Sequence, residues 1–302
     1  MSKSSEFASI ILPHLKEIEP NAQFIISLPV IKSSSGSKFY GKVGDASEVD
    51  QYVGEIESLK AINNAAPGLA PRVLAHGIAG VSEKHDRLGR PYFLSEYKDI
   101  TSLNDKTGDI LGKRMAEELH ANSSSNGFGF SVPTFCGATR QENGWYKTWV
   151  ECFDAMVGNL LVSLRERGTF SGLCTKGEEV RMRVIPYLLG SLSIQPALLH
   201  GDLWSGNAGT VGTTDEPVIF DPSSYYGHNE ADLAIARIFG GFPRSFFVTY
   251  HKYRPKTEPV EQYELRTDLY ELYHYLNHTV LFGSAYAGSA VKKMDRLLEQ
   301  CP

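Results

Sequence analysis

The feature that most constrains this 302-residue chain is a pair of polar motifs, each set behind an apolar lead-in. The first is LLHGDLWSGN over residues 198–207, and the second is VIFDP over residues 218–222. An isolated His-Gly-Asp is common in turns, because Gly and Asp suit turn conformations. Here Asp202 and Asn207 stand in a D-x-x-x-x-N spacing, and a short apolar strand then delivers Asp221. The combination indicates a functional site rather than a simple turn.

These side chains match the requirements of phosphoryl transfer. One carboxylate orients the attacking hydroxyl, while an amide and a second carboxylate hold Mg²⁺, which prefers oxygen ligands. The protein-kinase signature H-R-D-L-x-x-x-N has the same Asp-to-Asn interval, and its later D-F-G aspartate binds metal. We therefore predict a kinase that uses ATP and Mg²⁺, with Asp202 as the catalytic residue and Asn207 and Asp221 as metal ligands.

Charge and composition indicate which binding partners and which cellular compartment to expect. The formal net charge is −5, so no global basic field is present to hold nucleic acid or an anionic membrane. No run approaches the ~20 apolar residues of a membrane-spanning helix, and the start of the chain lacks the pattern of a signal peptide. The four cysteines form no C-x-x-C pair, which favours reduced thiols and a cytoplasmic location. The oligomeric state stays open.

The order of predicted elements changes along the chain. We expect strands over residues 23–31, 38–43, 72–77 and 91–97, and a helix opened by a capping box of Ser47 and Asp50. Beyond residue 98 helical patterns dominate, at 111–120, 149–167, 180–192 and from 231 onward. This order predicts an α+β, bilobal, protein-kinase-like fold. A small β-rich nucleotide-binding lobe would span residues 1–97, and a larger, mainly helical catalytic and substrate-binding lobe residues 98–302.

A kinase also needs a strand lysine, held by a helix glutamate, to grip the nucleotide phosphates. Lys42 is the candidate, with Lys38 as its competitor. On the following helix Glu55 borders the apolar stripe, whereas Glu57 points away from it, so we expect Lys42 to pair with Glu55.

The adenine is expected at the connection between the lobes, against the backbone of Glu96, Tyr97 and Lys98. No G-x-G-x-x-G lies between residues 24 and 40. Either the phosphate-covering loop is a shorter variant, or the serine-rich turn at 33–37 supplies backbone amides for the phosphates.

With these residues identified, the chain resembles the fructosamine-3-kinase family, also called ketosamine-3-kinases, which are relatives of aminoglycoside and choline kinases. The resemblance runs from about residue 39 to about residue 289. Trp204 separates the chain from aminoglycoside kinases, which usually carry His there. The segments that carry the resemblance are YGKV (40–43), GE (54–55), FGF (128–130), LHGDLWSGN (199–207), VIFDPSSYYGHNEADLAIA (218–236), FGGF (239–242), HYLNH (274–278) and FGS (282–284).

The resemblance implies an activity on ketosamines, which are sugar adducts on protein lysines or free amines. The family phosphorylates the 3-hydroxyl, and a 3-phosphate beside the C2 ketone can eliminate, which leads to deglycation. The preferred sugar stays open among ribulosamine, psicosamine and fructosamine. Two alternatives remain: a small-molecule kinase of the aminoglycoside or choline type, and a nucleotide-binding pseudokinase.

Further residues receive supporting roles in this hypothesis. We expect His200 to brace the catalytic loop, and Asp232 either to accept N–H bonds from that loop or to cap a helix. Trp204 would stack on the substrate or pack in the core, and His228 and Glu230 are substrate-side candidates. A last pair, His274 and His278, has the i, i+4 spacing of a metal site but no evident third ligand, so we expect these side chains to line the substrate cleft.

Overall fold

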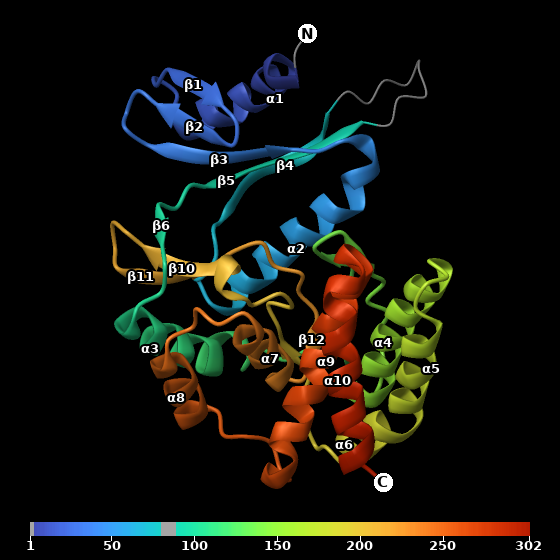
Figure 1. Cartoon of the computed structure of the whole chain (residues 1–302). Coiled ribbons are helices and arrows are strands. Elements are labelled where there is room, and N and C mark those ends of the chain that lie inside the picture. The colour runs from blue at the N-terminus through green and yellow to red at the C-terminus, as the bar shows by residue number, and fades with distance from the viewer. Residues whose placement is uncertain (1–2, 80–88) are drawn as a thin grey trace.

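The computed structural model describes residues 3–79 and 89–302, and these form two lobes (Figure 1). The first lobe is an antiparallel sheet in the order β1-β2-β3-β5-β4, with a helix, α1 (Lys3–Ile18), packed on it. A second helix, α2 (Val49–Ala65), descends from this sheet toward the other lobe (Figure 1). The strands are β1 (Phe24–Ser27), β2 (Val30–Ser33), β3 (Lys38–Val43), β4 (Val73–Ala79) and β5 (Arg90–Glu96).

The start of the chain differs from the expectation in two ways. The single strand predicted over residues 23–31 is split, because Pro29 has no N–H to donate and the chain turns there, so that Ser27 pairs with Val30. In addition, no helix was expected where α1 lies, with Phe7, Ile11 and Leu15 buried against the sheet. The four-residue spacing of these side chains was the available signal.

The chain becomes helical before α2 begins and before the predicted cap at Ser47. A helical turn already starts at Ala46, and the side chain of Glu48 accepts a 2.6 Å hydrogen bond from the backbone N–H of Asp45. The capping box is therefore formed by Asp45 and Glu48, and the assignment to Ser47 and Asp50 was wrong by two residues. Between the strands predicted at 72–77 and 91–97 the sequence also predicts a charged turn over residues 83–90, and most of this turn lies outside the described residues.

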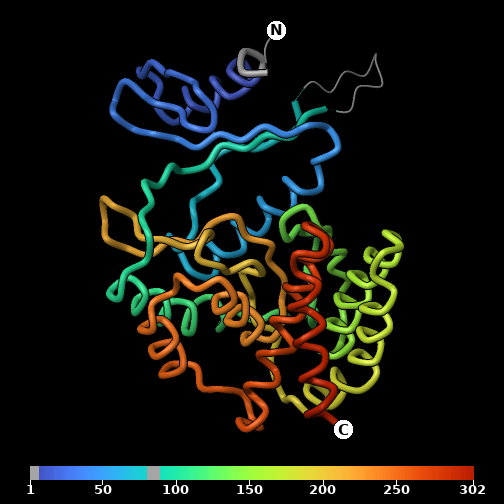
Figure 2. Tube along the Cα trace, in the orientation of Figure 1, coloured from blue at the N-terminus to red at the C-terminus, as the bar shows by residue number. Residues whose placement is uncertain are grey.

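The second lobe is mainly helical, and its helices pack around short strands that carry the polar motifs (Figures 1 and 2). The single helix predicted over 180–192 is instead a π turn at Val180–Val184 followed by a short helix. The helices are α3 (Asp105–Arg114), α4 (Trp149–Glu166), α5 (Ser171–Glu179), α6 (Ile185–Leu189), α7 (Glu230–Ile238), α8 (Arg244–Tyr253), α9 (Tyr263–Phe282) and α10 (Ser284–Gln300). The strands are β6 (Ile100–Thr101), β7 (Thr134–Cys136), β8 (Thr139–Gln141), β9 (Ala197–Leu198), β10 (Ala208–Val211), β11 (Glu216–Ile219) and β12 (Tyr226–Gly227).

The two lobes share α2. Its later residues Leu59 and Ile62 belong to the core cluster of the second lobe, which also contains Trp149 and Leu199. Its earlier residues contact the sheet through a small cluster around Phe93. Within the described ranges, no helix combines the length and the apolar character needed to cross a bilayer.

Close packing of α2 on the second lobe depends on Gly54. A Cβ at this position would lie 2.5 Å from the carbonyl oxygen of Pro133, which is backbone and cannot rotate away. The helix therefore approaches the segment before β7 more closely than any other residue would permit.

We expect Gly54→Ala to destabilise the fold by about 1–3 kcal/mol, because the added methyl group must displace the Pro133 backbone. The measurement is the free energy of unfolding from urea denaturation. Gly172→Ala is the matched control: Gly172 lies in α5, and a Cβ there would meet nothing within 4 Å, so alanine should be neutral or stabilise by up to about 1 kcal/mol. Equal effects at both positions would contradict this account.

Candidate active site

Two adjoining pockets lie between the lobes, and both are lined by Glu55 and Asp221. We call them the hinge pocket and the loop pocket. The hinge pocket is lined by Tyr40, Glu55, Leu59, Pro71, Phe93, Ser95, Glu96, Tyr97, Lys98, Ile100, Phe220 and Asp221. The loop pocket is lined by Lys42, Gln51, Glu55, Phe135, Gly137, Asp202, Trp204, Asn207, Asp221 and Pro222.

On the sheet side, Lys42 of β3 forms an ion pair with Glu55 of α2, with 2.7 Å between Nζ and Oε2. Burial alone would lower the pKa of the Lys42 ammonium, but the Glu55 carboxylate raises it above its ordinary value, so the lysine stays charged. The competing residues lie elsewhere: Lys38 lies over the ring of Tyr97, and Glu57 pairs with Lys60 on the surface.

On the other side, the loop after β9 is held by Asp232 of α7. The two carboxylate oxygens accept hydrogen bonds from the backbone N–H groups of His200 and Gly201, at 2.7 and 2.8 Å. His120 contacts the same carboxylate at 3.1 Å. Burial acts to raise the pKa of Asp232, but these contacts outweigh it and hold the pKa below its ordinary value. Of the two roles considered for Asp232, the structure therefore has it accept from the loop.

The imidazole of His200 ties the loop to the second motif. Its Nε2 lies 3.0 Å from the carbonyl oxygen of Phe220, and the backbone carbonyl of His200 accepts the N–H of Ser223 at 2.9 Å. Burial lowers the pKa of this histidine, so the ring is neutral at physiological pH. These contacts flank Asp221 on both sides.

Asp202 and Asn207 face each other within the loop. The amide Nδ2 of Asn207 donates to the backbone oxygen and to Oδ2 of Asp202, at 3.0 and 3.2 Å. Burial raises the pKa of Asp202 to about 6, although hydrogen bonds from the Cys136 thiol and the Asn207 amide oppose the rise. The Asp202 carboxylate thus lies in a sheltered position at the floor of the loop pocket.

Asp221 has a strained backbone. Its φ is +52°, in the left-handed region that residues other than glycine rarely adopt, and such strain is often found at functional sites. The N–H of the preceding residue, Phe220, donates to the carbonyl of Asn207 at 3.0 Å. The end of β11 and the end of the loop are therefore joined, and Asp221 faces the space shared by the two pockets.

The three predicted hinge residues, Glu96, Tyr97 and Lys98, line the hinge pocket. Glu96 ends β5 and pairs with Lys98 at 3.0 Å. The next strand, β6, pairs with β10 of the second lobe, so this stretch is the crossing between lobes.

The expectation that His228 and Glu230 contact substrate does not fit the structure. His228 is 0% exposed and its ring nitrogens contact Tyr270 and Thr257, each at 2.8 Å. Glu230 is 2% exposed and forms a buried ion pair with Arg266, 2.8 Å from its Nε. Both side chains therefore stabilise the packing of α7 on α9, and neither lines the hinge or loop pocket.

Trp204 is not a core residue. It is 39% exposed, lines the loop pocket beside Asp202, and makes an edge contact with the ring of Phe239.

The pair His274 and His278 does not line the cleft pockets as expected. His274 is buried within the second lobe. The ring of His278 turns back onto its own helix, where Nδ1 donates to the backbone carbonyl of His274 at 2.7 Å. The i, i+4 spacing thus produces a contact along α9 rather than two side chains facing substrate.

The serine-rich turn at 33–37 does not contribute to either cleft pocket. The hydroxyls of Ser33 and Ser35 instead bind the carboxylate of Glu19, just beyond the end of α1. This leaves a shorter phosphate-covering loop as the better of the two explanations for the missing glycine motif.

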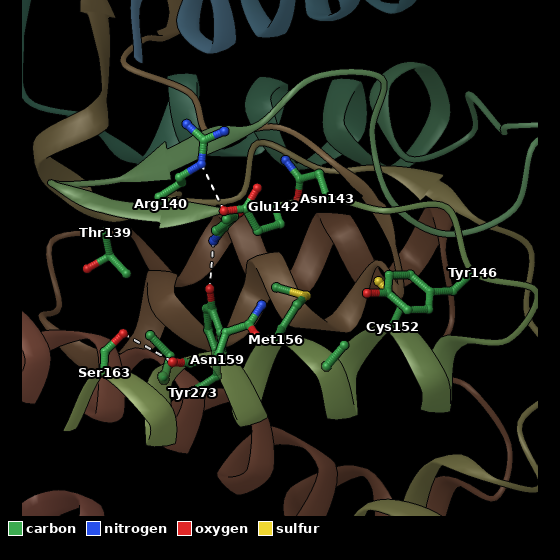
Figure 3. A pocket seen from close by; sticks show the side chains of 13 residues that line it. Thr139, Arg140, Glu142, Asn143, Tyr146, Cys152, Met156, Asn159, Ser163 and Tyr273 are labelled. Carbon is green, nitrogen blue, oxygen red and sulfur yellow. Dashed lines mark hydrogen bonds and ion pairs between the residues drawn. The ribbon is translucent and has the colours of Figure 1, made fainter. Parts of the chain in front are cut away.

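A further pocket lies away from these groups, between β8 and α4 (Figure 3). Gln141, one of the residues that line it, donates to the hydroxyl of Tyr273 at 2.6 Å. None of the residues predicted for the site lines it.

Several side chains at the cleft were not predicted from the sequence. Gln51 and Phe135 line the loop pocket, the thiol of Cys136 lies against Asp202, and His120 supports Asp232. Gln51 lies in the first turn of α2, on the same helix as Glu55, and this position in the sequence could have marked it as a cleft residue. The other three come from segments distant in the sequence, and no local pattern marks them.

A lysine–glutamate pair above a cleft, with an Asp–Asn–Asp set below it, defines a phosphotransferase with the bilobal architecture of protein kinases. The chain belongs to the fructosamine kinase family, whose family model matches residues 19–300. It is 44% identical to a mouse ketosamine-3-kinase over 280 residues, which cover 86% of this chain and 88% of the relative.

A second relative is similar in sequence, and a solved structure is similar in fold. A chloroplastic protein-ribulosamine 3-kinase of Arabidopsis thaliana is 41% identical over 211 residues; the match covers 70% of this chain and 63% of the relative's length. The fold is similar to that of a crystal structure of a putative fructosamine-3-kinase from Haemophilus somnus. The TM-score is 0.76 at 21% identity, over 95% of this chain and 96% of that one.

We expect Glu230→Gln to destabilise the protein by about 3–5 kcal/mol, because Arg266 would remain buried without its countercharge. Urea denaturation measures this, and Glu264→Gln, at an exposed partner of Arg237, should cost less than about 1 kcal/mol. A variant with wild-type stability and a raised KM for the sugar acceptor would restore Glu230 as a substrate residue.

Proposed function

We propose that this protein is an ATP- and Mg²⁺-dependent ketosamine 3-kinase, which phosphorylates the 3-hydroxyl of ribulosamine or fructosamine adducts. The observation that carries the proposal is the loop pocket, which gathers Lys42, Asp202, Asn207 and Asp221 around one space. The names of the mouse and Arabidopsis relatives support the choice of acceptor.

In this proposal ATP binds across both pockets. Its adenine lies in the hinge pocket against the backbone of residues 96–98, and Lys42, held by Glu55, binds its phosphates. The boundary between a nucleotide-binding lobe (1–97) and a catalytic lobe (98–302) then falls at this hinge.

Asn207 and Asp221 would hold Mg²⁺. Because Nδ2 of Asn207 donates to Asp202, its Oδ1 is the amide atom with lone pairs available for a cation. Together with the carboxylate of Asp221 this gives the oxygen donors that Mg²⁺ prefers. When bound, the ion supplies positive charge that stabilises the phosphate oxygens during transfer.

Asp202 would orient the acceptor hydroxyl and accept its proton, and His200 and Asp232 would support the loop. Positioning matters most, because the transition state of phosphoryl transfer is largely dissociative. Trp204, exposed at the mouth of the loop pocket, would stack on the sugar or on the alkyl stem of the modified lysine. The product, a 3-phosphate beside a ketone, can eliminate phosphate, and hydrolysis then frees the amine.

We also propose that the protein acts in the cytoplasm on ketosamine adducts of proteins or small amines. Its four cysteines are buried as free thiols, which supports a reducing compartment. The negative net charge supports substrates other than nucleic acid or anionic membranes.

The direct test is ATP consumption with a panel of acceptors. We expect turnover with ribulosyl-lysine or fructosyl-lysine and none with the 3-deoxy analogue, which lacks the accepting oxygen. Turnover with aminoglycosides or choline but not with ketosamines would replace the proposed acceptor. ATP binding without turnover on any acceptor would instead indicate a pseudokinase.

Two aspartate variants separate the roles in the loop pocket. Asp202→Asn should lower kcat by about 10²–10⁴-fold while nucleotide affinity is retained, because the amide cannot accept the proton. Asp221→Ala should also weaken Mg²⁺-dependent nucleotide binding, since a metal ligand is lost. Steady-state kinetics and nucleotide titration measure both, with Asp295→Asn on α10 as an exposed control. Unchanged turnover in Asp202→Asn would remove its proposed role.

A further inference from the structure

We propose that Cys136, Asp202 and His274 form a binding site for a thiophilic divalent cation of the zinc type, and that this cation inhibits the enzyme by occupying Asp202. The sulfur, carboxylate oxygen and imidazole nitrogen of these residues all lie within 4.8 Å of one another. Thiolate, imidazole and carboxylate are the donors that Zn²⁺ uses, and three protein ligands leave a fourth position open.

The three side chains come from distant parts of the chain. Cys136 ends β7, Asp202 lies in the loop after β9, and His274 lies in the middle of α9. Cys136 is 2% exposed and His274 3% exposed, whereas Asp202 lines the loop pocket. Because Asp202 itself lines the loop pocket, the cleft is the route by which a cation would reach the cluster.

The cluster contains a buried polar atom that has no hydrogen-bond partner. Nδ1 of His274 is buried and makes no hydrogen bond, and neither does Oδ1 of Asn277, one turn further along α9. Asn277 contacts Cys136 directly, since its Nδ2 donates to the Cys136 carbonyl at 3.3 Å. Buried polar atoms without partners are costly, and the imidazole of His274 is one of the three donors that a cation between these side chains would use.

The donor set selects against Mg²⁺. A small hard cation prefers oxygen ligands in octahedral geometry, whereas a thiolate and an imidazole favour Zn²⁺ or Co²⁺. Ligand atoms around tetrahedral Zn²⁺ lie about 3.5 Å apart, so side-chain movements of about 1 Å complete the site. On binding, the Cys136 thiol loses its proton to the buffer and the sulfur bonds to the metal; no electron is transferred.

Binding at this site removes Asp202 from its role in transfer. A carboxylate that coordinates a cation in the floor of the pocket is no longer placed to orient an acceptor hydroxyl. The inhibition rests on the proposed function, whereas cation binding itself does not, so the two are measured separately.

The binding test uses Co²⁺ as the probe, because a cobalt–thiolate bond gives a charge-transfer absorption in the near ultraviolet. We expect this band in the wild-type protein and in Cys152→Ser, a matched control at another buried free cysteine, and its loss in Cys136→Ser. Excess Mg²⁺ should leave the band in place. Absence of the band in the wild type, or its persistence in Cys136→Ser, would overturn the site.

The role of the histidine and the inhibition are tested in parallel. His274→Asn should keep the thiolate band but weaken Co²⁺ affinity at least about tenfold, and thermal denaturation verifies that each variant is folded. Zn²⁺ should inhibit ketosamine phosphorylation at saturating Mg²⁺, and Cys136→Ser should lose this sensitivity relative to its own uninhibited rate. Equal Zn²⁺ sensitivity in Cys136→Ser and Cys152→Ser would refute inhibition at this site, even in an active kinase.

Discussion

The buried carboxylate of Asp232 is the contact on which the lower half of the site depends. It accepts two backbone N–H groups of the loop and a contact from His120, and so fixes the peptide from which Asp202 projects. The loop is also packed closely against the segment after Asp221. Gly201 adopts a φ of +85°, and a Cβ there would lie 2.1 Å from the carbonyl oxygen of Ser223, so only glycine permits this approach. The carboxylate of Asp232, which lines neither pocket, thereby sets the position of Asp202, which lines the loop pocket.

The same helix carries a second buried carboxylate with a different task. Glu230, two residues before Asp232, is neutralised by Arg266 of α9, which also donates to the carbonyl oxygens of Thr257 and Pro259. The first turn of α7 thus anchors the catalytic loop on one side and the segment before α9 on the other. Glu230 was a substrate-side candidate in the sequence, but in the structure it stabilises the scaffold.

Features that depend on local spacing could be predicted from the sequence. The D-x-x-x-x-N interval, the strand before Asp221 and the position of Glu55 on its helix were all visible there, and the structure brings these residues to one cleft. Burial could not be predicted in the same way. His228 and Glu230 come shortly after the second motif, yet both side chains are buried. Contacts made by Cys136, His120 and Arg266 join segments more than thirty residues apart, so no local pattern encodes them.

The helix α2 joins the two lobes mechanically. Its first turns carry Glu55 and pack on the sheet, while Leu59 and Ile62 are embedded in the other lobe and Ser58 accepts the N–H of Ser224 at 3.0 Å. The ion pair between Lys42 and Glu55 therefore also links the sheet to a helix anchored in the second lobe. A substitution that loosens the seat of α2 in that lobe would shift the carboxylate that holds Lys42, even though the substituted residue touches neither member of the pair.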